Sequence, residues 1–299
     1  MEKHATNTEM NFGILASGHL GYSCVTSLWQ KGIKPYFLCS DRSSSALISF
    51  AKENNLPMFV GNPRNGRGVS ALTKLNVVPD LIVSINYLFL LDDDFIQFPV
   101  YGCINFHGSL LPRYRGRTPH VWAIINNEVK TGMTAHFIDK GCDTGPIILQ
   151  HEIEIEPDHT GGDLLALYER EYPHLVEKTI RLFSNGNVPQ GTLQDETKAT
   201  YYGKRIPDDG LICWDWQRER IYNWVRAQAA PYPGAFCFYD EEKIIIDKIE
   251  FADHGYHFET ANGTILESGL HPTVKTPNGS IRILTTRKSC IFEKGKVLI

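Results

Sequence analysis

The stretch NFHGSLLPRYRGRTPH, residues 105–120, contains the end of one structural element and the start of the next. Its first residues complete an apolar run, CINFH, whose composition is typical of a buried strand. Thr118 followed by Pro119 is typical of a helix N-cap with proline at the first helical position. A strand, a short loop and a helix in succession predict an α/β fold around this stretch.

Similar apolar runs, rich in β-branched and aromatic residues, recur in the N-terminal part of the 299-residue chain at 11–17, 34–40, 81–87 and 133–139. Helical stretches separate them. We therefore expect βαβ units and a Rossmann-like, mainly parallel sheet with helices on both faces. A longer helix is predicted over roughly 160–184, with a kink or break at Pro173.

The pattern of hydrophobic runs and turn signals changes near residue 200. The runs GAFCFYD, KIIIDKIEF, YHFET and SIRILTT are short, β-rich and separated by turn signals such as ADHG and PNG. They predict a small antiparallel sheet, or a barrel-like one. We place the boundary so that residues 1–203 form a Rossmann-like catalytic domain and residues 204–299 a smaller, β-rich domain.

Composition excludes several classes of protein. Hydrophobic residues make up 42% of the chain and charged residues 21%, which argues against disorder. A formal net charge of −4 disfavours nucleic acid as the main ligand. The seven cysteines contain no CxxC pair, so we expect reduced thiols and no zinc site. A polar N-terminus and the lack of a long apolar run predict a cytoplasmic protein that does not enter a membrane.

Two polar side chains share one face of the run CINFH. Side chains alternate along a strand, so Asn105 and His107 point the same way, about 6 to 7 Å apart. Asp143 lies in a later turn between Gly141 and Gly145, which let the backbone approach a ligand closely. These three side chains could contact one small chemical group of a ligand. Alternatively, each could simply form hydrogen bonds with nearby backbone.

Other candidate ligand contacts lie elsewhere in the first half. Ser17, Gly18 and His19 follow the first predicted strand at a helix start, a position suited to phosphate, although a plain tight turn is the alternative. The full GxGxxG fingerprint is absent. Arg113 and Arg115 could hold a diphosphate or remain solvated. We expect no metal site, because His254-x-x-His257 has no third ligand in the sequence.

The combination of Asn105-x-His107-x-SLLP with the later Asp143-Thr-Gly-Pro resembles the folate-dependent formyltransferase family. The resemblance implies that Asn105, His107 and Asp143 form the catalytic triad and that N10-formyltetrahydrofolate is the formyl donor. It also implies that the segment around Leu88, Phe89, Leu90 and Leu91 lines the pterin pocket, with Gly141 beside the cofactor and Tyr87 beside the substrate. An apolar strand end entering a helix is the alternative for that segment.

Acyl-transfer chemistry supports the same roles. An amine that attacks a formyl carbon must lose a proton, and the carbonyl oxygen becomes negative. Asp143 would act as the base through a water molecule, Asn105 would donate to the oxygen, and a protonated His107 would stabilise its charge.

The acceptor is expected to be a nucleotide-linked amino sugar. The runs RYRGRTPHVWAIIN, YYGKR and PYPGAF are similar to those of bacterial sugar N-formyltransferases, which act in O-antigen and other lipopolysaccharide biosynthesis. Tyr222, Trp224 and Tyr232 could stack a thymine or uracil ring and Arg226 could pair with phosphate, or this cluster could be interdomain core. The first choice is dTDP-4-amino-4,6-dideoxyglucose and the second a dTDP-3-amino-3,6-dideoxyhexose.

Three alternatives stay open at this point. A methionyl-tRNA formyltransferase would share the chemistry, but the segment CSDRSSSALISFAKENNLP lacks a basic cluster to hold an acceptor stem. A Rossmann-like protein that binds a nucleotide or folate without catalysis is the second, and a hydrolase with water as acceptor is the third. A homodimer through the C-terminal β-rich domain is also expected, because small sheets with exposed edges often pair.

Overall fold

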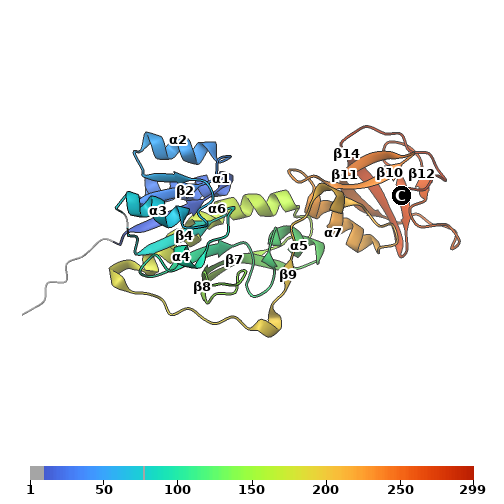
Figure 1. The fold of residues 1–299 in the computed structure, drawn as a ribbon. Helices are drawn as coiled ribbons and strands as arrows, with labels where there is room; N and C mark the ends of the chain where they lie inside the picture. The colour runs from blue at the N-terminus through green and yellow to red at the C-terminus, as the bar shows by residue number, and fades with distance from the viewer. Residues whose placement is uncertain (1–9, 77) are drawn as a thin grey trace, which may run out of the picture. The chain divides into compact units, whose positions relative to one another are not determined.

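A seven-stranded sheet organises the first of two compact units in the computed structural model, which describes residues 10–76 and 78–299. Its strand order is β3-β2-β1-β4-β5-β7-β8 (Figure 1). The strands are β1 (Phe12–Ala16), β2 (Phe37–Ser40), β3 (Met58–Val60), β4 (Leu81–Ile85), β5 (Cys103–His107), β7 (Lys130–Phe137) and β8 (Ile147–Glu154).

The strands from β3 to β5 pair in parallel, and the direction changes at β7. Neighbours in this part of the sheet pair in parallel, whereas β7 pairs with β5 in the antiparallel direction. The order reverses at β1 and β4, the place where open α/β sheets bind ligands at the carboxyl ends of their strands. The predicted Rossmann-like, mainly parallel sheet is confirmed.

Helices cover both faces of this sheet. One apolar core joins its strands to α1 (Gly18–Gln30), α2 (Ser45–Glu53) and α6 (Gly161–Leu182). The other core joins the opposite face to α3 (Arg67–Lys74) and α4 (Asp93–Ile96). Side chains on both faces of each buried strand therefore pack against apolar neighbours. This explains the nearly continuous hydrophobic runs in the sequence.

The long helix α6 is one element, with Pro173 in its interior. The helix predicted over 160–184 is confirmed and is not split at Pro173, whereas a kink at this residue stays a prediction. Tyr172, Leu175 and Val176 beside the proline are all buried in the core. Packing on both sides of Pro173 thus holds the helix together where the proline removes one backbone donor.

The second unit comprises residues 117–131, 154–166 and 202–299. It contains a five-stranded antiparallel sheet in the order β10-β11-β14-β13-β12. These strands are β10 (Ala235–Tyr239), β11 (Glu242–Ala252), β12 (Ile265–Glu267), β13 (Thr273–Thr276) and β14 (Gly279–Thr286). The predicted small, β-rich C-terminal part is confirmed, whereas the division at residue 203 stays a prediction.

One predicted strand of this unit is wrong. YHFET, residues 256–260, contains no strand residue and ends in a turn and a bend, and Phe258 is 82% exposed, so no neighbouring strand covers its ring. Helices α5 (Pro119–Ile125) and α7 (Arg218–Gln228) belong to the same unit. Pro119 begins α5 as expected, although Thr118 caps it without a side-chain hydrogen bond.

The remaining elements are short: β6 (Arg115–Gly116), β9 (Tyr201–Tyr202), and the 3₁₀ turns at Ser184–Gly186, Glu196–Lys198 and Pro207–Gly210. Among the described residues, no helix combines the length and the apolar character needed to cross a membrane.

Candidate active site

Strand β5 carries Asn105 and His107 to the carboxyl edge of the sheet. Ile104 and Phe106, which flank Asn105, are buried in the core on the α1 and α6 side, so Asn105 and His107 face the other way. Asn105 is aligned with Ser84 on β4 and with His136 on β7. The strand alternation predicted from CINFH thus holds, and it brings a third polar residue, His136, opposite Asn105.

The loop after β5 is tied to its neighbours by specific hydrogen bonds. The Thr134 hydroxyl donates to the carbonyl of Ser109 over 2.6 Å and accepts from the N–H of Leu111 over 3.2 Å. Gln150 donates to the Leu111 carbonyl over 3.0 Å. Residues 109–111 are therefore fixed to β7 and β8, which sets the path of the chain beyond His107.

Asp143 reaches the same place from the turn that follows β7. Asp139 closes this turn by accepting hydrogen bonds from the Gly141 N–H over 3.0 Å and the Thr144 hydroxyl over 2.6 Å. A side chain at position 145 would place its Cβ 1.9 Å from the Phe137 carbonyl oxygen, so only glycine fits there. Asp143 itself has a left-handed φ of +57°, an uncommon conformation for this residue.

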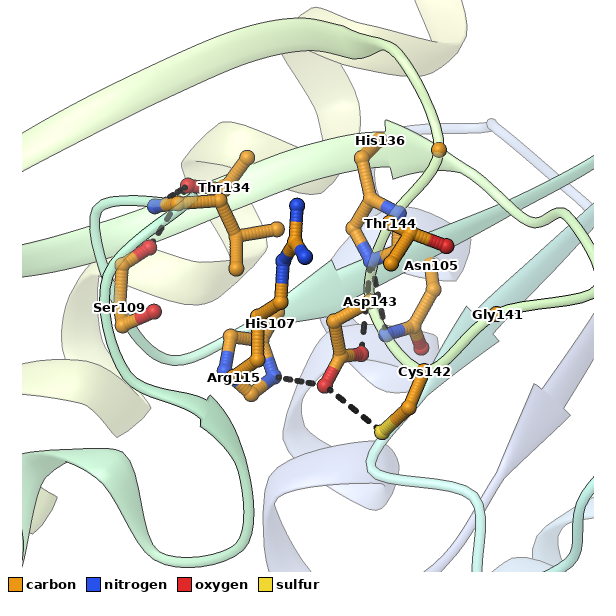
Figure 2. Close-up of polar contacts among 12 residues, drawn as sticks. Asn105, His107, Ser109, Arg115, Thr134, His136, Gly141, Cys142, Asp143 and Thr144 are labelled. Atoms are coloured by element: carbon orange, nitrogen blue, oxygen red, sulfur yellow. Dashed lines mark hydrogen bonds and ion pairs between the residues drawn. The ribbon is translucent and has the colours of Figure 1, made fainter. Parts of the chain in front are cut away.

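The Asp143 carboxylate lies between two imidazole rings (Figure 2). Its Oδ2 is 3.5 Å from His107 Nδ1, and its Oδ1 is 3.7 Å from His136 Nε2. Burial raises the pKa of Asp143, but His107, the Gly116 N–H and His136 together outweigh burial and lower it below its ordinary value. The carboxylate is therefore ionised at neutral pH and can accept a proton.

His107 is oriented by the backbone of the following loop. Its Nε2 lies 2.7 Å from the carbonyl oxygen of Tyr114, an atom that can only accept. The ring therefore carries a proton on Nε2 and directs Nδ1 at Asp143. The structure thus brings together Asn105, His107 and Asp143, whereas the catalytic role of each stays a prediction.

His136 is a site residue that the sequence analysis missed. Burial lowers its pKa to about 4, so the ring is neutral at pH 7. Its Nδ1 lies 2.8 Å from the Phe137 carbonyl and carries the proton, which leaves Nε2 to accept from the Asn105 amide 3.3 Å away. The alternation of MTAHFID, with His136 on the face of a strand beside β5, is the signal that could have identified it.

The segment predicted to meet the pterin leaves the sheet at the same edge, because β4 and β5 are parallel neighbours. Leu88 is 48% exposed and Leu90 is 70% exposed, while Tyr87 and Phe89 meet edge to face at 5.5 Å. The Tyr87 hydroxyl donates to the Gly61 carbonyl over 3.0 Å. Two apolar side chains are thus exposed in the segment that follows β4 at this edge of the sheet, an arrangement suited to a flat ring.

The start of α1 is already occupied by the protein itself. The Gly18 N–H donates to the Ser44 hydroxyl over 2.9 Å, and that hydroxyl donates to the buried Asp41 carboxylate over 2.5 Å. An anion here would face Asp41, so the geometry favours the plain turn for Ser17 and Gly18. The His19 side chain is 73% exposed.

The two arginines of the loop differ. Arg115 is fully buried, and its guanidinium pairs with Glu196 over 2.6 Å, whereas Arg113 is exposed and lies over the Tyr114 ring at 5.4 Å. The positive charge of Arg115 is already paired with Glu196. Arg115 is therefore not part of the substrate site that we propose.

The aromatic cluster of the second unit is engaged largely within that unit. Trp224 is buried and donates to the Gly210 carbonyl over 3.1 Å. Arg226 is buried and donates to the His159 carbonyl over 2.6 Å. Tyr222 and Tyr232 are half-buried, and the Tyr232 hydroxyl is bonded to His120. Trp224 and Arg226 therefore support the core alternative, and only the two tyrosines are kept as candidate contacts.

Residues 10–76 and 78–299 contain no group of three or more His, Cys, Asp or Glu side chains placed to hold a metal ion.

Comparison with known proteins identifies the family to which the chain is similar. A formyl transferase model matches residues 62–178, and a model of the formyl transferase C-terminal domain matches residues 205–291. The bifunctional polymyxin resistance protein ArnA of Wigglesworthia glossinidia brevipalpis is 34% identical over 255 residues, which are 83% of this chain. The chain spans only 38% of the length of that relative.

Two solved structures share the fold. The N-formyltransferase from Helicobacter canadensis, in complex with folinic acid and dTDP-3-aminofucose, has a TM-score of 0.70 and 18% identity, over 92% of this chain and 99% of that one. A 4-N formyltransferase from Francisella tularensis has a TM-score of 0.65 and 21% identity, over 79% of this chain and 96% of that one. Because the two family models together match more than half of its length, the chain belongs to the formyl transferase family.

Proposed function

We propose that this protein transfers a formyl group from N10-formyltetrahydrofolate to the amino group of a nucleotide-linked amino sugar. One observation carries the proposal: an ionised Asp143 lies 3.5 Å from His107 at the sheet edge that also presents Asn105. A base, a ring that can carry charge and an amide donor are the groups that formyl transfer requires at one carbon atom.

The residues divide the chemistry as follows. A bond forms between the acceptor nitrogen and the formyl carbon, the bond from that carbon to the donor nitrogen breaks, and one proton passes from acceptor to donor. Asp143 takes the proton from the amine through a water molecule. The Asn105 amide has two N–H groups, of which one bonds to His136 and the other donates to the formyl oxygen. His107 stabilises the negative charge that develops on this oxygen.

The donor fits the segment between β4 and α4. Leu88 and Leu90 expose apolar surface after β4, which ends at the same edge of the sheet as β5, and a pterin ring would cover it. The family to which the chain belongs supports a folate donor, as does the folinic acid bound to the relative from Helicobacter canadensis. When bound, the donor supplies the formyl carbon, and the chain supplies orientation and proton transfer.

An amino sugar is supported by the relatives rather than by a particular contact. Both solved relatives described above are N-formyltransferases, and one was solved with a dTDP-linked amino sugar. Arg113 is the contact that we propose for the diphosphate, while Tyr222 and Tyr232 belong to the second unit and stay predictions from the sequence alone. We propose dTDP-4-amino-4,6-dideoxyglucose first and a dTDP-3-amino-3,6-dideoxyhexose second.

The test is a panel assay. The full-length protein and its Asp143→Asn variant are incubated with N10-formyltetrahydrofolate and dTDP-linked or UDP-linked 3-amino and 4-amino sugars, and products are identified by mass spectrometry. We expect a formamide on one class of sugar with the unchanged protein and almost none with the variant. Formation of no formylated sugar from any member of the panel would contradict the proposal.

Salt dependence separates the sugar from methionyl-tRNA as acceptor. A nucleotide diphosphate sugar carries only two phosphate groups, so its Michaelis constant should change little between about 50 and 200 mM salt. An acceptor that depends on many phosphate contacts would instead lose affinity steeply over this range. Efficient, strongly salt-dependent formylation of methionyl-tRNA would favour the alternative.

A further inference from the structure

A buried arginine, Arg115, is paired with the largely exposed carboxylate of Glu196. Arg115 is fully buried, and its Nη2 and Nη1 donate to the two carboxylate oxygens of Glu196 over 2.6 and 2.9 Å. The Tyr201 hydroxyl also bonds to the guanidinium. A buried cation is tolerated only when its hydrogen bonds are satisfied, and this one is satisfied by residues 194–201.

Gln194 connects this cation to the turn that carries Asp143. Its Oε1 accepts from Arg115 Nη2 over 2.8 Å and from Nε over 3.2 Å. Its Nε2 donates to the carbonyl of Asp143 over 2.8 Å and to the carbonyl of Gly145 over 2.7 Å. If the amide were flipped, its NH₂ group would face a guanidinium that can only donate. Arg115 therefore determines which end of Gln194 faces the turn.

The residues on either side of Arg115 contact both members of the proposed acid–base pair. The Gly116 N–H donates to Asp143 Oδ2 over 2.9 Å, and the Tyr114 carbonyl bonds to His107 Nε2 over 2.7 Å. Thr200 holds this short segment, because its carbonyl accepts from the Arg115 N–H over 2.9 Å and its hydroxyl accepts from the Tyr114 N–H over 2.8 Å. One segment thus fixes the ring and the carboxylate together.

We propose that Arg115 and Gln194 are positioning residues, which hold the left-handed turn at Asp143 so that its carboxylate stays against His107. The proposal rests on the proposed function, since it assumes that Asp143 is the base. Neither residue is placed to touch substrate: Arg115 is fully buried, and both polar ends of Gln194 are used by protein groups. They act on the reaction only through the turn.

The decisive variant is Gln194→Glu. A carboxylate at this position keeps the acceptor for Arg115 and gains an ion pair with it, so the fold is retained. It has no N–H, and the carbonyls of Asp143 and Gly145 lose their two hydrogen bonds. We expect kcat to fall by about tenfold to a hundredfold, because small misplacements of a reacting group are costly, with Michaelis constants for donor and acceptor nearly unchanged.

The matched control is Gln190→Glu, the same chemical change four positions earlier at an exposed residue of the same segment. It should leave kcat unchanged. Gln194→Met, which removes the amide without adding a charge, should reproduce the loss and shows that the loss does not come from the new carboxylate. Wild-type kcat in both Gln194 variants would overturn the proposal.

A second measurement does not depend on activity. Hydrogen–deuterium exchange of the full-length protein should be faster across residues 140–146 in Gln194→Glu than in the unchanged protein, and equal to it in Gln190→Glu. Unchanged exchange in Gln194→Glu would overturn the positioning role even if no acceptor were known. Failure of the proposed function would be recognised separately, as an inactive unchanged protein whose exchange still responds to Gln194→Glu.

Discussion

Asp143 Oδ2 lies 3.5 Å from His107 Nδ1, although the two residues come from different elements, one from the turn after β7 and one from the end of β5 (Figure 2). Because β7 runs antiparallel to β5 and its last residue, Phe137, lies opposite Ile104, the turn after β7 must fold back along the sheet for Asp143 to reach His107. The path of this turn thus determines which carboxylate meets the imidazole.

The first prediction concerns this pair. Asp143→Asn keeps the size of the side chain and removes the proton acceptor, so kcat should fall by about a hundredfold or more in a variant that still folds. The fall in kcat is measured as the rate of formamide production by the purified proteins. Asp253→Asn, at a fully exposed carboxylate, is the control and should be as active as the unchanged protein. Wild-type turnover by Asp143→Asn would exclude this residue as the base.

The second prediction tests whether His136 acts through Asn105. Position 136 is buried, with His136 only 2% exposed, so a leucine can replace it there. His136→Leu nevertheless removes the nitrogen that accepts from the Asn105 amide and orients it. We expect kcat to fall by roughly tenfold, and Asn105→Ala to lower it by about a hundredfold. If the two form one unit, the double variant should be no slower than Asn105→Ala alone. Independent, multiplied losses in the double variant would contradict this coupling.

The third prediction concerns the turn itself. Gly145→Ala places a Cβ 1.9 Å from the Phe137 carbonyl oxygen, so the backbone that carries Asp143 must shift. We expect a loss of about 1 to 3 kcal/mol in the free energy of unfolding and a large drop in kcat. Urea denaturation and steady-state rates measure the two effects. Gly203→Ala, where an added Cβ meets nothing within 4 Å, is the control.

The fourth prediction is a loss of stability in mild acid. Burial lowers the pKa of His136 in the folded protein to about 4, below the 6.5 of an exposed ring. Between these values the unfolded chain binds more protons than the folded one, so the free energy of unfolding falls as the pH falls. The slope from this ring is at most about 1.4 kcal/mol per pH unit.

Urea denaturation at several pH values between 7 and 4 would measure this slope. His136→Leu should remove one proton from the difference and flatten the curve in this range. An identical slope in the variant and the unchanged protein would show that His136 does not titrate as its burial implies.

Local patterns in the sequence were sufficient for much of the first unit. Apolar runs of period two or continuous hydrophobicity identified β1, β4 and β5, and the Thr118-Pro119 pair located the start of α5. The alternation in CINFH placed Asn105 and His107 on one face. These features depend on neighbours within a few positions, so they can be recognised without knowledge of the fold.

Features that depend on distant partners could not be recognised in this way. Arg115 looked like a solvated or phosphate-binding residue, but its partner Glu196 is 81 positions away. Trp224 looked like a stacking platform, but the carbonyl of Gly210 and the surrounding core bury it. The run YHFET has the composition of a strand, yet no neighbouring strand pairs with it.

The two compact units are interleaved along the chain, since residues 117–131 and 154–166 belong with the C-terminal part. Within that second unit, Asn223 of α7 bonds to Asn127 over 3.1 Å, and Arg226 bonds to the His159 carbonyl over 2.6 Å. A truncated chain that stops near 203 would leave both segments without these partners, with apolar surface of α5 newly open to water. Exchanging whole catalytic modules between relatives would therefore require several matched junctions, because no single cut separates the units.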